Sequence, residues 1–171
     1  GVIDTAGNVI VPFEFSKIEL AIDSAYTGFI TIRRNKKNLY GFIDENGKQM
    51  CLPKFVKTEA FKNGFARVQL KHKEWLFINK EMNILPGGPY KDAQDFSEGL
   101  AAVKVKNLWG FIDESGTFVI EAQYRSVGSF SDGMAPVYTK TDYVDKGKTR
   151  KKNAYIYINT NNEKSIQDLY T

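Results

Sequence analysis

The stretch Gly99-Leu100-Ala101-Ala102-Val103, followed by Trp109-Gly110-Phe111-Ile112-Asp113, decides the fold of this 171-residue chain, because both halves recur. Glycines that open the first half stand at positions 28, 64, 99 and 133, at intervals of 36, 35 and 34 residues. The second half returns at 40–44, 75–79 and 155–159. Since two separate anchors keep their spacing through four units, we predict a tandem repeat whose units bury apolar faces on their neighbours.

Alternating apolar residues predict that each unit consists of β-strands. Ala101, Val103 and Val105 fall on one side of the first segment, which is the period of a strand. The run Asp113-Glu114-Ser115-Gly116 between two apolar segments predicts a hairpin turn, because glycine adopts the positive φ that closes it. We therefore expect an all-β fold, a tandem repeat array of three-stranded antiparallel meanders that is elongated or curved. A closed propeller-like ring is the alternative.

The spacing predicts a single repeat domain over 1–171, with a partial unit at 1–25 and units at about 26–61, 62–96, 97–130 and 131–171. Because 1–4 aligns with 41–44, the chain enters a repeat halfway, and we expect further sequence before it. No run approaches the roughly 18 apolar residues of a membrane span, so we expect no membrane insertion. The one cysteine, Cys51, is expected to be a buried, inert thiol. The sequence does not decide among cell surface, periplasm and cytoplasm.

An aromatic residue opens the second half of every unit, at Tyr40, Trp75, Trp109 and Tyr155. We expect these four to be structural residues in equivalent buried positions, since each unit must bury the same surface. A platform of exposed rings for sugars is the alternative. Gly41 and Gly110 follow two of these rings, where a missing side chain lets another strand or ring approach closely. The connecting loops add aromatic pairs that we expect to pack back onto the sheet, namely Phe55 and Phe61, Tyr90 and Phe96, and Tyr124 and Phe130.

These motifs resemble the WG-repeat proteins of bacteria over nearly the whole chain. The residues that carry the resemblance are 99–103, Trp-Gly-Phe-Ile-Asp at 109–113, Gly116, Tyr124 and Phe-Ser-Asp-Gly at 130–133. The chain departs from the pattern where Leu76 and Ile156 replace the motif glycine, where Met82 replaces the turn glycine, and at an insertion over 141–153. The resemblance implies a non-catalytic repeat module and brings no catalytic residues.

Sites for chemistry are scarce in the sequence. His72 is the only histidine and lies between two lysines at an expected hairpin tip, so no triad and no zinc site are expected. The run 44–47 has the oxygen ligands of a calcium loop but lacks its remaining carboxylates, and a hairpin turn explains it. We expect no enzyme, no catalytic residue, no metal and no cofactor. Two carboxylates brought together by the fold would make a glycan-active enzyme the third alternative.

Basic residues recur at the turn between the first two strands of every unit. The formal net charge is +4, while 146–152 alone holds five basic residues, so the rest of the chain is slightly acidic. If the units stack in register, these turns line one edge that could bind anions. Charged tips that merely keep the strands soluble and prevent edge pairing are the alternative. The candidate binding residues are Arg33, Arg34, Lys36, Lys37, Lys71, Lys73, Lys104, Lys106, Lys148, Arg150, Lys151 and Lys152.

The function that we expect is a protein-interaction scaffold whose partner is another protein. A module that binds an anionic glycan or a nucleic acid through the basic edge is the alternative. The sequence does not identify the partner, the oligomeric state or the binding surface.

Overall fold

The computed structural model describes residues 1–22, 27–33, 39–70 and 73–165, and these residues form strands, turns and loops without a helix. None of them therefore forms a helix that could cross a membrane. The chain divides into two compact units, Gly1–Pro89 and Tyr90–Thr171. All strand pairs are antiparallel and no described sheet closes on itself, so the predicted all-β repeat of antiparallel meanders is confirmed.

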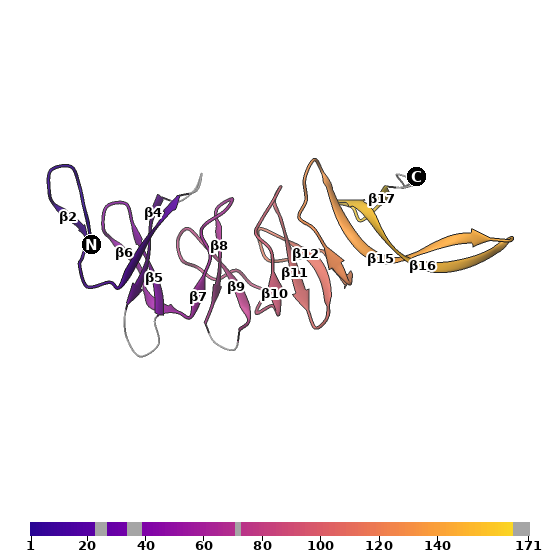
Figure 1. The fold of residues 1–171 in the computed structure, drawn as a ribbon, viewed down its shortest axis with the longest axis horizontal. Coiled ribbons are helices and arrows are strands. Elements are labelled where there is room, and N and C mark those ends of the chain that lie inside the picture. The colour runs from indigo at the N-terminus through magenta and orange to yellow at the C-terminus, as the bar shows by residue number, and fades with distance from the viewer. Residues whose placement is uncertain (23–26, 34–38, 71–72, 166–171) are drawn as a thin grey trace. The chain divides into compact units, whose positions relative to one another are not determined.

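The first unit holds three sheets (Figure 1). The two-stranded sheet consists of β1 (Val2–Ile3) and β2 (Val9–Val11). The four-stranded sheet runs in the order β3 (Lys17–Ile22), β4 (Thr27–Arg33), β5 (Leu39–Asp44) and β6 (Gln49–Phe55). The three-stranded sheet consists of β7 (Lys57–Thr58), β8 (Phe65–Gln69) and β9 (Trp75–Asn79).

The second unit holds two four-stranded sheets (Figure 1). One runs in the order β10 (Asp92–Ala93), β11 (Leu100–Val105), β12 (Leu108–Asp113) and β13 (Phe118–Tyr124). The other runs in the order β14 (Ser126–Val127), β15 (Met134–Asp145), β16 (Lys148–Asn159) and β17 (Lys164–Ser165).

The connecting loop contributes a fourth strand that the sequence did not indicate. The three predicted strands of the unit at 97–130 are β11, β12 and β13, and β10 pairs with β11 through Asp92 and Ala93 alone. In the last sheet, β14 pairs with β15 in the same way. A strand of two residues is too short to show alternation, which is why the sequence predicted only three strands in each unit.

Tight turns explain why glycines precede the strands. The backbones of Glu98 and Gly99 both have positive φ, 51° and 77°, and Ser97 pairs with Leu100 across them. Positive φ at both central residues defines the two-residue type I′ hairpin, whose twist matches that of the strands it joins. The turns at Asn63-Gly64 and Asp132-Gly133 have the same form.

The predicted hairpin turn after the second strand is present, and an aspartate side chain also holds it. Oδ1 of Asp113 accepts hydrogen bonds from the backbone N–H groups of Ser115 at 2.9 Å and Thr117 at 3.0 Å. Gly116 lies at φ 84° and donates its N–H to the Asp113 carbonyl oxygen. Asp44 organises the turn at 44–47 in the same way, so these carboxylates serve the backbone.

Two residues replace the turn glycine and contribute contacts of their own. Met82 keeps the left-handed conformation, with φ 65°, and its side chain is buried in the core of the first unit. Asn162 has φ 63°, and its Oδ1 accepts a hydrogen bond of 2.5 Å from the hydroxyl group of Tyr124 in the preceding repeat. Packing and hydrogen bonding thus offset the cost of a left-handed non-glycine residue, which is about 1–2 kcal/mol.

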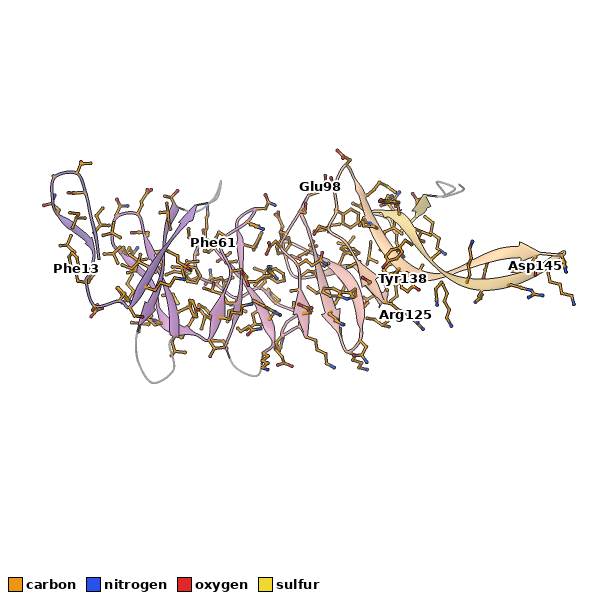
Figure 2. All side chains as sticks on the ribbon, viewed as in Figure 1. Phe13, Phe61, Glu98, Arg125, Tyr138 and Asp145 are labelled. Atoms are coloured by element: carbon orange, nitrogen blue, oxygen red, sulfur yellow. The ribbon has the colours of Figure 1, made fainter. Side chains whose placement is uncertain are left out.

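Within each unit, the core forms where the aromatic face of one sheet meets the aliphatic face of the next. In the second unit, Trp109 and Phe111 on the aromatic face of the β10–β13 sheet belong to one cluster with Ala135, Val137 and Ile158 on the aliphatic face of the next sheet. In the first unit, Phe42 of β5 packs in the same cluster as Ile78 of β9. Side chains fill the space between these successive sheets (Figure 2). The loop aromatics predicted to pack back, from Phe55 to Phe130, are all buried.

The equivalent burial predicted for the four repeated aromatics is wrong for Tyr155. Trp75 and Trp109 are buried and Tyr40 is half-buried, whereas 63% of Tyr155 is exposed. Among the described residues, no further sheet covers the aromatic face on which Tyr155 lies. The position is therefore core only where another repeat follows it.

Gly110, the glycine of the Trp-Gly motif, lies opposite a bulge in the neighbouring strand β13. Phe111 pairs with Ile120 but Trp109 pairs with Tyr124, so β13 carries two extra residues opposite Gly110. A Cβ atom added at Gly110 would lie 2.5 Å from the backbone oxygen of Ile120. At Gly41 the same atom would lie 2.8 Å from the backbone oxygen of Cys51. The predicted close approach is thus confirmed, and the approaching group is the backbone of a strand.

The Asp113 turn makes stability depend on pH. Hydrogen bonds from the Ser115 side chain and from the backbone N–H of Thr117 lower the pKa of Asp113 below its ordinary 3.8. Because the folded pKa is depressed, this stabilisation is complete above the unfolded pKa and is lost as the pH falls through the folded pKa. We expect urea unfolding at pH 7 to 2.5 to show the wild type losing its advantage over Asp113→Asn across that range. Asparagine keeps the acceptor oxygen without titrating, and Asn79 and Asn159 hold the same kind of turn. Parallel pH profiles would contradict the assignment.

Candidate functional site

The β15–β16 hairpin is the largest departure from the repeat. The two strands pair over 12 residues each, from Met134 opposite Asn159 to Asp145 opposite Lys148. Among the described residues, β14 reaches to Tyr138 on one outer side and β17 pairs with Tyr157 and Ile158 on the other. We call residues 139–154 the distal ribbon. Figure 1 shows it extending beyond the other strands of its sheet, with Tyr138 at its base and Asp145 near its tip in Figure 2.

The sequence of the distal ribbon explains why it continues the hairpin. Lys146 and Gly147 form a two-residue turn with φ of 49° and 73°, which is again the type I′ geometry. Threonine, tyrosine and valine in 139–144 favour strands. The stretch predicted as an insertion, 141–153, is therefore a regular extension of two strands. The Lys-Gly turn flanked by such residues was the signal that could have revealed it.

The pairing register distributes the basic side chains over both faces. Directly opposite residues share a face and successive residues alternate. Lys148, Arg150 and Lys152 therefore lie on one face, and Lys140 and Lys151 lie on the other. All five of these residues are exposed. The distal ribbon thus presents positive charge on both sides.

The two strands of the distal ribbon differ in charge. The β16 segment 148–154 carries Lys148, Arg150, Lys151 and Lys152 and has no acidic residue. The β15 segment 139–145 carries Lys140 together with Asp142 and Asp145. The side chains of Arg150 and Asp145 form an ion pair of 3.2 Å. Because both side chains are substantially exposed, this pair orients the guanidinium group more than it stabilises the fold.

Aromatic rings lie at the base of the distal ribbon. The rings of Tyr138 and Tyr155 pack with centroids 4.7 Å apart, and Tyr157 is the next residue on the same face. Tyr155 is 63% exposed and Tyr157 is 44% exposed. These rings share their face with Lys140 and Lys151, so basic and aromatic groups adjoin each other. Tyr138 and Tyr157 were not among the candidate residues from the sequence. The sequence does not show whether another sheet covers the face of β15 and β16 on which they lie.

The other predicted basic residues have varied surroundings. Lys104 lies over the ring of Trp109, with Nζ 5.6 Å from its centroid, so it packs on the repeat. Lys73 and Lys106 are exposed turn residues with positive φ. Arg33 ends β4, and its side chain is not described. Arg34, Lys36, Lys37, Lys71 and also His72 lie outside the described residues. The common basic edge therefore stays a prediction.

Reactive groups are few in the described part of the chain. It contains no group of three or more His, Cys, Asp or Glu residues that could hold a metal ion. The Cys51 side chain is buried, and burial raises the pKa of its thiol. A buried thiol with a raised pKa is a poor nucleophile, because the thiolate is the reactive form.

A family model described as WG containing repeat matches residues 1–27, 40–75, 77–109 and 109–140. No curated protein and no solved structure matches the chain. The four matches cover well over half of the chain and include the Trp-Gly motif with its bulge. The last match ends at Lys140, the second residue of the distal ribbon, so most of the ribbon lies beyond the matched segments. The chain therefore belongs to the WG containing repeat family.

Proposed function

We propose that this WG-repeat chain is a non-catalytic protein-interaction scaffold and that the distal ribbon is its binding element. The observation that carries the proposal is the projection of the ribbon from its sheet. The core clusters of both units lie between sheets and, among the side chains that the structure describes, include none from 139–154. The ribbon adds a long exposed surface that packing of the repeats does not require.

The charge of the ribbon favours an acidic partner. Residues 139–154 contain six basic residues, including Lys140 and Lys146, against two aspartates. This excess equals the net charge of +4 of the whole chain, so the rest is neutral overall. A local positive field of this kind speeds association with an acidic protein surface and excludes basic ones.

The lack of catalysis is part of the proposal. Support comes from the aspartates of the turns, whose oxygens already accept backbone hydrogen bonds, and from the buried thiol of Cys51. These groups maintain the fold and leave little for general acid–base or nucleophilic chemistry.

A shortened ribbon tests the proposal. Thr139 and Ala154 are directly opposite each other and belong to the series of hydrogen-bonded pairs that starts at Asp145 and Lys148, so residues 140–153 can be replaced by Asn-Gly, which closes a type I′ turn. We expect this variant to unfold at the same urea concentration as the wild type but to lose at least about tenfold in affinity for fluorescent poly-glutamate. Binding by the wild type should weaken between about 50 and 200 mM salt, because exposed charges are screened.

Equal binding by the shortened variant, or no binding by the wild type at low salt, would overturn the proposal. Heparin and duplex DNA serve as comparison probes at the same concentration of negative charge. Tighter binding of either one than of poly-glutamate would favour the anionic glycan or nucleic acid alternative.

A further inference from the structure

We infer that an acidic, extended segment of the partner protein binds as an additional β-strand along the outer edge of β16, over residues 148–154. The inference rests on the proposed function, because it specifies how the distal ribbon recognises its partner. Three features of the ribbon support it: an edge beside which the described residues place no strand, a register that directs backbone groups to that edge, and the charge of the strand that forms it.

The outer edge of β16 is open in the distal ribbon. Among the described residues, β16 has β15 on one side, and on the other side only β17, which pairs with Tyr157 and Ile158. From Lys148 to Ala154 no strand of the described residues lies on that second side. An open edge presents unpaired backbone groups to a further strand, and strand addition to such an edge is an established mode of peptide recognition.

The register identifies which backbone groups face outward. In a two-residue hairpin the residues that flank the turn, Asp145 and Lys148, exchange hydrogen bonds with each other, and every second pair does the same. The residues between those pairs, Thr149, Lys151 and Asn153, direct their N–H and C=O groups away from β15. Tyr157 belongs to the same series and is the residue that pairs with Ser165 of β17. An added strand would continue that pairing toward the tip.

Charge selects this edge and the composition of the added strand. Side chains of an added strand would lie beside Lys148, Arg150 and Lys152 on one face and beside Lys151 on the other. Beside β15 they would meet Asp142 and Asp145 instead. Opposite charges on adjacent strands attract, whereas lysines on an edge discourage pairing with a basic or a purely apolar strand. The β16 edge therefore fits a strand of about six residues with acidic side chains on both faces.

Peptide binding to the full chain tests strand addition directly. The probe is a fluorescent eight-residue peptide that repeats Glu-Glu-Thr-Thr, which places glutamates on both faces of a strand, and its control carries N-methyl groups on the backbone nitrogens of both edges. The two peptides have the same charge, but the control cannot donate backbone hydrogen bonds from either edge. We expect fluorescence anisotropy to show at least about tenfold weaker binding of the control. Equal affinities would overturn strand addition while leaving poly-glutamate binding, and hence the proposed function, intact.

Two matched variants locate the edge. Lys151→Glu and Lys140→Glu make the same change of charge on the same face of the distal ribbon, one on β16 and one on β15. We expect Lys151→Glu to weaken binding of the unmethylated peptide at least about tenfold and Lys140→Glu about threefold or less. Equal losses of affinity in the two variants would show that the overall positive charge of the ribbon attracts the peptide. That result would overturn binding at the β16 edge. Neither residue belongs to a core cluster, so both variants should fold.

Discussion

Replacing Trp109 with alanine should lower the free energy of unfolding by about 3–5 kcal/mol, the range for large aromatic residues in a core. The indole is 9% exposed and lies in the cluster that joins the β10–β13 sheet to the next sheet. Its removal would leave a cavity against Tyr124, its cross-strand partner, and would take away the ring over which Lys104 packs. Urea denaturation followed by circular dichroism would measure the loss.

Tyr155→Ala provides the control for this prediction. Tyr155 occupies the equivalent position in the last repeat, but its 63% exposure means that little apolar surface is lost with it. We expect a loss of about 1 kcal/mol or less, because exposed side chains contribute little packing. Similar losses in the two variants would contradict the view that a following sheet makes this position part of the core. Unchanged stability in Trp109→Ala would revive a binding role for the ring.

Gly110→Ala should destabilise the second unit by about 3 kcal/mol, the upper part of the range for overpacking. The new Cβ would lie 2.5 Å from the oxygen of Ile120 and 2.7 Å from the nitrogen of Ala122. Both atoms belong to the backbone of β13, so relief requires the bulge to move and not merely a side chain. Thermal unfolding monitored by circular dichroism would report the change.

Gly99→Ala separates steric conflict from backbone strain. A Cβ at Gly99 meets nothing within 4 Å, but φ there is +77°, so the expected cost is the left-handed penalty of about 1–2 kcal/mol. A smaller loss of stability in Gly110→Ala than in Gly99→Ala would show that the backbone of the β13 bulge moves aside at little cost. The motif glycine would then need another explanation.

The sequence predicted those parts of the fold that depend on local patterns repeated several times. The recurrence of two anchors every 34 to 36 residues predicted the repeat. Local backbone requirements within one unit predicted the turns that contain aspartate and glycine, and the close approach at Gly110. The short strands β10 and β14 were missed because pairing of two residues leaves no periodic pattern. The exposure of Tyr155 was missed because an identical position is buried or exposed according to what covers it.

The candidate site was predicted in part. Lys148, Arg150, Lys151 and Lys152 were recognised as a basic segment, but charge alone does not reveal that the segment is a strand. The edge of β16 arises from the difference in length between β15–β16 and their neighbours β14 and β17. Whether an edge is open depends on which strands pair with each other, and the composition of one segment does not show this.

The unlike faces of the packed sheets give the repeat a direction. Trp109 and Phe111 of one sheet meet Ala135 and Ile158 of the next, so a sheet inserted in reverse would set rings against rings and small residues against small residues. A duplication of one whole period preserves the order of faces, whereas a duplication of part of a period does not. Repeat number can therefore change during evolution in single steps, each of which reuses an interface that the chain already has.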